Sequence, residues 1–415
     1  MDLVPIRIKH FVLILGLVFF SNILFSKNTT NIPASLSQKI EIPFEYVNGL
    51  IELNIKMNSI PLKFIYDTGA EHTILSKKEI AGLIGLKILK EIKVYGADFN
   101  KQLSAYITNP VDIILEDRYE KQDPILILSD DIFSFNNIGE STIHGIIGAS
   151  FFRHKFIKID YLKQILTIYP YDYKLNMNGF EEMPVTFYGH KPVIQSKIII
   201  NKQDTSISTK ILMDTGSSVP LIFMKTIDSK FKLPKKLIKG RLGIGLGGDL
   251  EGWIGLINKV NLGNFKFNEL ICKFQDIDSL VISETSTRRN GIVGNEVLRK
   301  FTIIIDNIHK KLYFKPNRLY KKKIKYDKSG ITLFAAGKNF DKFYIKYIIP
   351  DSPAGLAGLK PNDRIISVQY ISTIFWGMNG IVNLFKKKEN KKIRLKIIRD
   401  NKKYVYIFRL KDMFH

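Results

Sequence analysis

The stretch FIYDTGAEHTIL, residues 64–75, begins as an apolar strand and then places a carboxylate, Asp67, where another buried side chain is expected. A second stretch, KILMDTGSSVPLIF at residues 210–223, has the same arrangement around Asp214. Asp followed by Gly is an ordinary way to end a strand, because Asp hydrogen-bonds the backbone of a turn and Gly accepts a positive φ. Two occurrences in one chain require a comparison of the sequence around them.

The sequence around the two Asp-Thr-Gly motifs is repeated in order. Asp67 and Asp214 are 147 residues apart, and the segments GIIGASFFRHKFIKID (145–160) and GIVGNEVLRKFTIIID (291–306) follow them at nearly the same spacing. Self-similarity at a fixed period indicates copies of one structural unit. We therefore interpret the order of strand, Asp-Thr-Gly, β region and Gly-apolar-apolar-Gly as an internal duplication.

Both copies are expected to consist of strands. Short runs rich in Ile, Val, Phe and Tyr alternate with Gly, Asn and Asp, and segments with helical periodicity are few. We predict two tandem β lobes, at residues 40–172 and 183–317, joined by a turn-rich linker. Each lobe contains a glycine-bearing hairpin candidate, VYGADFNKQL (94–103) in the first and GIGLGGDLEG (243–252) in the second.

Two Asp-Thr-Gly motifs, each with its own apolar-apolar-Gly segment, resemble the aspartic peptidase superfamily. DTGA is similar to the retropepsin form and DTGSS to the pepsin form. The resemblance covers most of residues 40–317 and implies two retropepsin-like β-barrel lobes that form a pepsin-like pseudo-dimer, with Asp67 and Asp214 as the catalytic dyad. Pairing of each lobe with another chain is the alternative, and the short linker favours the internal pair.

The chemistry of peptide hydrolysis explains the need for two carboxyl groups. One takes a proton from water while the other protonates the carbonyl oxygen. Two carboxyls about 3 Å apart cannot both ionise, so the pair holds one shared proton. Ser217 follows the second motif where Ala70 follows the first, and its hydroxyl can hydrogen-bond a carboxylate. We therefore expect the ionised member to be Asp214 and the pH optimum to lie closer to neutral than that of pepsin.

The same resemblance assigns supporting roles to the residues around the dyad. The glycines of the two motifs have no Cβ, so the loops can approach each other. The two threonines are expected to lock the loops by reciprocal hydrogen bonds, and the last glycine of each apolar-apolar-Gly segment to let that strand pass close beneath. The expected supporting residues are Thr68, Gly69, Ala70, Thr215, Gly216, Ser217, Gly148 and Gly294.

The two hairpins are expected to act as flaps that cover the substrate and exclude water. The Tyr-Gly pair of the first hairpin resembles the flap tyrosine of pepsin, and an ordinary strand tyrosine is the alternative. The flap candidates are Tyr95, Gly96, Gly247 and Gly248.

The C-terminal part of the chain has a different character. PDSPAGLAGLKPNDRIISV (350–368) resembles a PDZ domain, with Asn362 at a turn position where the family normally has Gly and where Asn is also tolerated. SGITLF (329–334) is the candidate carboxylate-binding loop. The resemblance implies a PDZ domain at 325–413, a small β barrel with two helices that captures C-terminal peptides at a sheet edge. The groove candidates, for each of which core packing is the alternative, are Gly330, Ile331, Thr332, Leu333, Ile381 and Leu384.

The N-terminus has basic residues followed by the apolar run FVLILGLVFFSNILF (11–25). This run is short for a transmembrane helix and typical of a signal-peptide core. We expect residues 1–26 to be a signal peptide, with an uncleaved membrane anchor as the alternative, and the expected location is the periplasm or the cell surface. Cys272 is the only cysteine, so no intrachain disulfide can form.

The chain carries a formal charge of +24, and residues 308–415 hold 26 Lys and Arg against 7 Asp and Glu. No zinc-ligand spacing, basic-aromatic signature or helix-turn-helix pattern accompanies this charge, so nucleic acid is not an expected partner. A solvated basic surface is the favoured interpretation, and association with an anionic membrane or envelope surface is the second.

These features predict an exported, monomeric aspartic endopeptidase that acts on polypeptides, with a PDZ domain that tethers the substrate or gates the cleft. No metal or organic cofactor is implied, because the dyad handles both the water and the proton transfers. The histidines lack HExxH spacing and the motifs lack a Ser/His partner. The alternative is a catalytically silent pepsin-like scaffold whose function is PDZ-mediated peptide binding.

Overall fold

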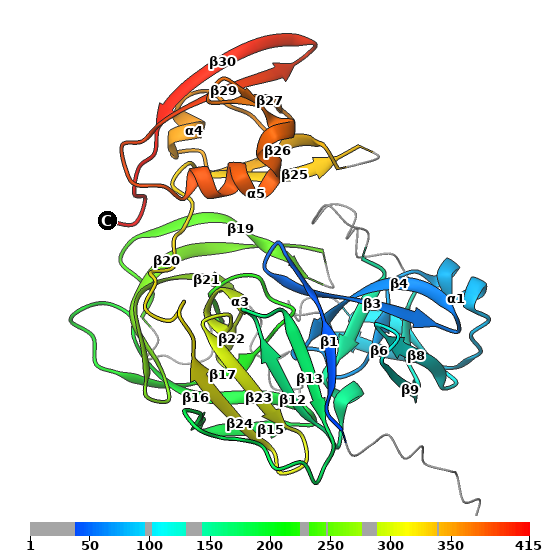
Figure 1. Cartoon of the computed structure of the whole chain (residues 1–415). Helices are drawn as coiled ribbons and strands as arrows, with labels where there is room; N and C mark the ends of the chain where they lie inside the picture. Colours follow the sequence, from blue (N-terminus) through cyan, green and yellow to red (C-terminus); the bar gives the residue numbers. More distant parts are fainter. Residues whose placement is uncertain are drawn as a thin grey trace, which may run out of the picture. The chain divides into compact units, whose positions relative to one another are not determined.

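The computed structural model describes residues 38–95, 102–129, 143–224, 232–245, 248–275, 289–337 and 340–415. Within these ranges the chain is mostly β, as predicted, and its strands form four sheets (Figure 1). No helix in this part of the chain is long and apolar enough to cross a membrane. The expected signal segment, residues 1–26, lies outside the described residues.

The first large sheet carries Asp67 at the end of its strand β4. This strand is apolar on both faces because both are covered: Phe64 and Tyr66 enter the main core, and Ile65 enters a second cluster. In spatial order the strands are β6 (Ile88–Tyr95), β7 (Gln102–Thr108), β10 (Leu126–Leu128), β5 (Ile74–Leu75), β11 (Gly145–Gly148), β4 (Ile60–Asp67), β3 (Leu50–Met57), β8 (Val111–Leu115) and β9 (Tyr119–Asp123), with β2 (Glu45–Val47) paired to β3.

The second large sheet has a matching centre. Its strands, in spatial order, are β15 (Val185–Tyr188), β16 (Lys191–Ile199), β17 (Ile207–Met213), β22 (Gly291–Val293), β18 (Leu221–Met224), β21 (Phe265–Gln275), β20 (Gly248–Leu262) and β19 (Leu237–Gly245). Here β22 pairs in parallel with β17 and antiparallel with β18, as β11 does with β4 and β5 in the first sheet. The two Asp-Thr-Gly segments therefore leave equivalent strands of their sheets.

A third sheet joins the two halves of the region before the C-terminal sheet, residues 40–172 and 183–317, which together we call the body. Its strands are β1 (Ile40–Pro43), β13 (Ile165–Tyr169), β12 (Phe156–Asp160), β23 (Phe301–Asp306), β24 (Lys311–Pro316) and β14 (Glu181–Glu182). At its centre β12 pairs antiparallel with β23, with Ile157 opposite Ile305 (Figure 1). A short helix precedes each central strand, η3 (Ala149–Phe152) before β12 and α3 (Asn295–Leu298) before β23, while α1 (Lys78–Ile84) follows β5.

The C-terminal sheet contains β25 (Ile331–Ala336), β26 (Lys342–Ile348), β27 (Arg364–Val368), β29 (Lys392–Arg399) and β30 (Lys402–Arg409), with β28 (Ile371–Ser372) paired to β27. Two helices, α4 (Pro353–Leu356) and α5 (Thr373–Phe385), accompany this sheet around a core of its own. Ser352 caps α4 by accepting a hydrogen bond from the N–H of Gly355 at 3.2 Å. Asn362 has a φ of 70°, the left-handed conformation expected of a residue in a glycine position.

Candidate active site

Asp67 and Asp214 occupy equivalent places at the ends of β4 and β17. Gly148 of β11 lies opposite Asp67 in the sheet register, and the N–H of Asp214 donates to the carbonyl of Val293 in β22 at 3.0 Å. The structure brings the two side chains together, and their carboxyl groups are hydrogen-bonded to each other.

Each aspartate needs glycine two residues later, because the opposite carboxyl group occupies the space of a side chain. A Cβ on Gly69 would lie 2.8 Å from Cγ of Asp214, and a Cβ on Gly216 would lie 2.4 Å from Cγ of Asp67. Both distances are too short for carbon atoms, so any other residue at these positions would displace a carboxyl group.

Gly148 and Gly294 allow the neighbouring strands to pass close to the two loops. A Cβ on Gly148 would lie 2.4 Å from the backbone carbonyl of His72, and a Cβ on Gly294 would lie 2.3 Å from the carbonyl oxygen of Val219. In both halves of the body, the glycine that ends the apolar-apolar-Gly segment lies against the backbone of the aspartate-bearing loop.

The threonines of the two motifs hold the loops together by four reciprocal hydrogen bonds, which we call the threonine grip. The Thr68 hydroxyl donates to the carbonyl of Met213 at 2.6 Å and accepts from the N–H of Thr215 at 3.1 Å. The Thr215 hydroxyl donates to the carbonyl of Tyr66 at 2.8 Å and accepts from the N–H of Thr68 at 3.0 Å. Both threonines are buried, so the grip sets the separation of the two loops without competition from water.

The two carboxyl groups have unequal surroundings. Burial raises the pKa of both above the usual range of aspartic acid. The Asp67 carboxylate accepts hydrogen bonds from two backbone N–H groups of its own loop, at 2.7 and 3.2 Å. The Asp214 carboxyl accepts one from the N–H of Gly216 at 2.8 Å, and the negative charge of Asp67 raises the pKa of Asp214 further. These contacts favour the charge on Asp67 and the proton on Asp214.

This direction is opposite to the expectation drawn from Ser217, which placed the ionised member at Asp214. The reason lies in the backbone and not in the hydroxyl group. The N–H of Ala70 reaches the carboxylate of Asp67 at 3.2 Å, whereas the N–H of Ser217 is directed to the main-chain carbonyl of Asp214 at 3.4 Å. A backbone donor to the charged form favours ionisation on the side of Asp67.

Asn295 connects the Asp214 loop to Tyr161 and to the turn between β2 and β3, and it was not among the site residues predicted from the sequence. This fully buried side chain donates through Nδ2 to the carbonyl oxygens of Gly49 at 2.8 Å and Thr215 at 2.6 Å, while its Oδ1 accepts from the Tyr161 hydroxyl at 2.7 Å. In the repeat, Asn295 occupies the position of Ala149. A polar residue where the other copy has alanine was the signal that could have identified it.

Two cationic residues near the dyad were also missed. Arg289 is buried, at 7 % exposure, and its positive charge favours the ionised form of both aspartates. Burial lowers the pKa of Arg289 to about 10, and the two carboxyls oppose this change. Lys191 is half-buried and lies within electrostatic range of both Asp67 and Arg289. Arg289 stands two residues before Gly291, where the first copy has the apolar Ile143 before Gly145, and this contrast was visible in the sequence.

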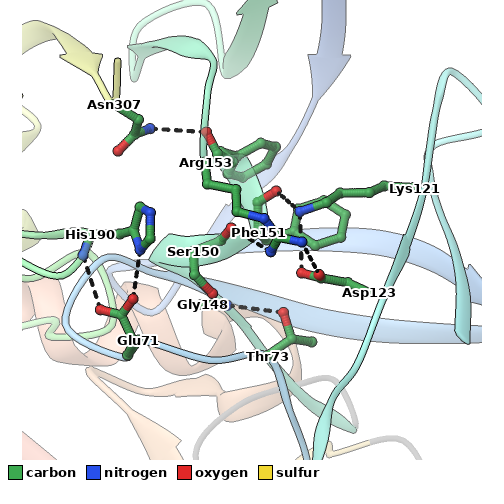
Figure 2. A network of polar contacts seen from close by, with 11 residues as sticks. Glu71, Thr73, Lys121, Asp123, Gly148, Ser150, Phe151, Arg153, His190 and Asn307 are labelled. Atoms are coloured by element: carbon green, nitrogen blue, oxygen red, sulfur yellow. Dashed lines mark hydrogen bonds and ion pairs between the residues drawn. The ribbon is translucent and has the colours of Figure 1, made fainter. Parts of the chain in front are cut away.

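Glu71, which follows Ala70, connects the Asp67 loop to the second half of the body. Figure 2 shows the Glu71 carboxylate between two nitrogen atoms of His190, at 3.1 Å from the backbone N–H and 2.6 Å from the ring Nδ1. Burial acts against the charge, but the hydrogen bonds from His190 outweigh it and lower the pKa of Glu71. These hydrogen bonds hold the turn at Gly189, where a Cβ would lie 2.6 Å from the Glu71 carboxylate, against the first loop.

A second network in Figure 2 supports the segment after Gly148. The buried Asp123 pairs with Arg153 at 2.8 Å and with Lys121 at 3.2 Å. Lys121 also donates to the carbonyl of Phe151 in η3 at 2.6 Å. These contacts fasten η3 to the first large sheet and so support the strand that lies under the Asp67 loop.

The predicted hairpins are present as paired strands, but the flap assignment stays a prediction. Tyr95 pairs with Gln102 at the end of β6 and β7, and Gly248 pairs with Gly245 at the end of β19 and β20. Gly96 and Gly247 lie outside the described residues. Within the described ranges, no group of three or more His, Cys, Asp or Glu side chains is arranged to hold a metal ion.

The PDZ groove candidates are mostly core residues. Ile331, Leu333, Ile381 and Leu384 are all less than 9 % exposed and belong to one buried cluster. Thr332 is exposed on β25, and Gly330 is buried with a φ of 80°. The structure therefore places these four apolar side chains inside the domain, which is the alternative that the sequence left open.

Comparison with known proteins identifies the C-terminal region. Residues 344–399 match the family model of the PDZ domain. No curated protein matches the chain. Among solved structures, basic 7S globulin from soybean is 10 % identical, with 69 % of this chain and 98 % of that chain covered and a TM-score of 0.43. The aspartic proteinase from Irpex lacteus is 12 % identical, with 69 % and 100 % covered and a TM-score of 0.45. At such low scores these likenesses add nothing to the geometry of the dyad. The chain thus has a mostly β body followed by a PDZ domain.

Proposed function

We propose that this chain is an aspartic endopeptidase in which Asp67 and Asp214 hydrolyse peptide bonds of a polypeptide substrate. The observation that carries the proposal is the pair of carboxyl groups, one half-buried and one buried, which are hydrogen-bonded to each other between loops fixed by the threonine grip. A turn-forming aspartate has no need of a second carboxyl. Asp160, for example, accepts two backbone hydrogen bonds at 3.1 Å after β12 and serves as an ordinary turn residue.

The asymmetry of the pair assigns the two roles. The Asp67 carboxylate takes a proton from a water molecule as the water oxygen bonds to the peptide carbonyl carbon, and Asp214 gives its proton to the carbonyl oxygen. When the C–N bond breaks, Asp67 returns its proton to the leaving amine. Asp214 regains a proton from the hydroxyl of the tetrahedral intermediate, so the pair ends in its starting state.

This mechanism predicts a bell-shaped dependence of activity on pH. Activity rises as Asp67 ionises and falls as Asp214 loses the shared proton, so the two limbs belong to the pair. Because burial raises the pKa of both carboxyls above the usual aspartate range, the optimum lies well above pH 2. Maximal activity near pH 2 would contradict this mechanism.

We further propose that residues 40–172 and 183–317 are two copies of one lobe, each of which supplies one aspartate-bearing loop. The matching pairing of β11 and β22 at the centre of the two sheets supports this division. On the same proposal the protein is exported and monomeric, and its PDZ domain binds peptide segments of the substrate.

Cleavage of a mixture of unfolded proteins, with and without a pepstatin-type inhibitor, tests the proposed activity. We expect cleavage products between pH 4 and 7 that disappear with the inhibitor and with the Asp67→Asn variant. A wild-type chain that is folded and cleaves nothing over this range would instead support a silent scaffold whose function is peptide binding by the PDZ domain.

A further inference from the structure

The loop before β25 is the part of the PDZ domain that the sequence assigns to a ligand carboxylate. In that binding mode, successive backbone N–H groups form a nest for the C-terminal carboxylate of a peptide. Here the nest already holds a carboxylate of the chain itself. Asp327 Oδ1 accepts hydrogen bonds from the N–H of Gly330 at 2.6 Å and from the N–H of Ser329 at 3.0 Å.

The third donor of the loop is also paired within the chain. The N–H of Ile331 donates to the hydroxyl oxygen of Ser329 at 3.1 Å, and that hydroxyl lies 2.9 Å and 3.0 Å from the two oxygens of Asp327. Ser329 and Gly330 are buried. The three consecutive N–H groups from Ser329 to Ile331 therefore all have an acceptor that belongs to the loop.

A ligand carboxylate would have to displace Asp327 or share its donors. Replacing the hydrogen bonds to Asp327 by equivalent bonds to another carboxylate brings no net gain. Sharing them would place two negative charges against one set of donors, which is unfavourable in a partly buried site. Burial raises the pKa of Asp327 to about 6, so at pH 7.5 its carboxylate is ionised and occupies the nest.

The edge of β25 offers a different way to bind a peptide. Among the described strands, β25 ends its sheet and pairs only with β26, while α5 packs beside it. Strand addition at such an edge uses main-chain hydrogen bonds along the peptide and needs no terminal carboxylate. The exposed Thr332 lies on this strand.

We propose that this PDZ domain binds an internal, extended segment of its partner along β25, and not a free C-terminus. The juxtaposition that carries the inference is the edge strand directly after a nest closed by Asp327. The inference deepens the peptide-binding part of the proposed function and does not depend on catalysis by the dyad.

The test compares peptides with and without a terminal charge on the full-length chain. Asp67→Asn is introduced so that bound peptides stay intact. Random-sequence decapeptide libraries are screened in two forms, with a free C-terminal carboxylate and with a C-terminal amide, at pH 7.5. Hydrogen exchange at residues 331–336 then identifies peptides that protect β25, and the Kd of each is measured in both forms by fluorescence anisotropy.

We expect peptides that protect β25 to bind equally in both forms, with Kd values within about 2-fold. In Asp327→Ala, which frees the N–H groups of Ser329 and Gly330, the free-carboxylate form should gain about 10-fold or more over its amide. Asp327→Asn is the matched control, because its side-chain oxygen still accepts from both N–H groups and keeps the nest closed.

Two results would overturn the inference. One is a loss of about 10-fold or more on amidation in the chain with the native Asp327. The other is a failure of both libraries to protect residues 331–336. Because the acid-to-amide comparison is made with the native loop, it stands even when the Asp327→Ala chain does not fold. Loss of peptidase activity leaves it unaffected, since only binding is measured.

Discussion

Thr68→Val should separate the stabilising role of the threonine grip from the chemistry of the carboxyls. Valine has nearly the same shape as threonine, but it lacks the hydroxyl that makes two of the four bonds of the grip. The carbonyl of Met213 and the N–H of Thr215 then lose this partner in a buried environment.

The expected loss of unfolding free energy follows from these two backbone groups. A buried donor or acceptor left without a partner costs about 1–3 kcal/mol, so two of them destabilise the body by about 2–6 kcal/mol. Small shifts of the loops recover part of this energy, and we expect about 3 kcal/mol. The same shifts move the two carboxyls relative to each other, and misplacement on the order of 1 Å reduces kcat by about 100-fold.

Urea unfolding followed by tryptophan fluorescence measures the effect on stability. Trp253 lies in β20 of the body and Trp376 in α5 of the PDZ domain, so Trp376→Phe leaves a reporter of the body alone. Thr68→Ser is the matched control, since it keeps the hydroxyl and loses one methyl group, worth about 0.8 kcal/mol. Equal urea midpoints and equal turnover of Thr68→Val and Thr68→Ser would refute a role of the Thr68 hydroxyl in holding the loops.

Three further changes test the electrostatics and the domain organisation. Asp214→Asn should stabilise the body at high pH. Folding raises the pKa of Asp214, so the protonated carboxyl stabilises the folded state fully below the unfolded pKa. This stabilisation is lost as pH rises through the folded pKa, and asparagine does not lose it because it does not titrate. Melting temperatures of the variant and the wild type should therefore diverge from pH 4 to pH 8, and parallel curves would contradict the assignment. Arg289→Met removes a charge that lowers the pKa of both aspartates, so both limbs of the pH–rate profile should move to higher pH, whereas Arg289→Lys should restore them. An unchanged profile in Arg289→Met would exclude Arg289 from the electrostatics of the dyad. Truncation after Lys325 removes the PDZ domain but keeps Tyr320, which packs on the core, and the carbonyl of Leu319, which binds Lys300 at 2.8 Å. We expect hydrolysis of a short synthetic peptide to persist and that of a protein substrate to fall, mainly through KM; equal loss on both, in a body that still folds, would make the domain a structural part of the enzyme.

The β body and the meeting point of the two loops could be predicted because their causes are local and repeated. Phe64, Ile65 and Tyr66 are apolar in succession because both faces of β4 are covered. The Asp-Thr-Gly motif follows that strand, and the second half of the chain has the same order of residues. Such a pattern has few structural solutions.

The finer features of the site depend on contacts between residues far apart in the sequence, so no local sequence pattern predicts them. The two backbone N–H groups that favour the charged form of Asp67 are placed by the course of the main chain, which the choice between Ala70 and Ser217 does not encode. In the PDZ loop, Asp327 reads as an ordinary polar turn residue until its hydrogen bonds are seen. Groove and core positions of β25 share one alternating pattern, so burial alone separates them.

The most direct test of the dyad is the turnover of Asp67→Asn, Asp214→Asn and the double variant on one unfolded protein substrate at the optimal pH of the wild type. Two groups that act as one catalytic unit are not additive. We predict that each single variant loses nearly all activity, by about 1,000-fold or more, while its fluorescence shows an intact fold, and that the double variant is scarcely slower than either. Wild-type turnover in either single variant, or losses that multiply in the double variant, would contradict a shared-proton dyad of Asp67 and Asp214.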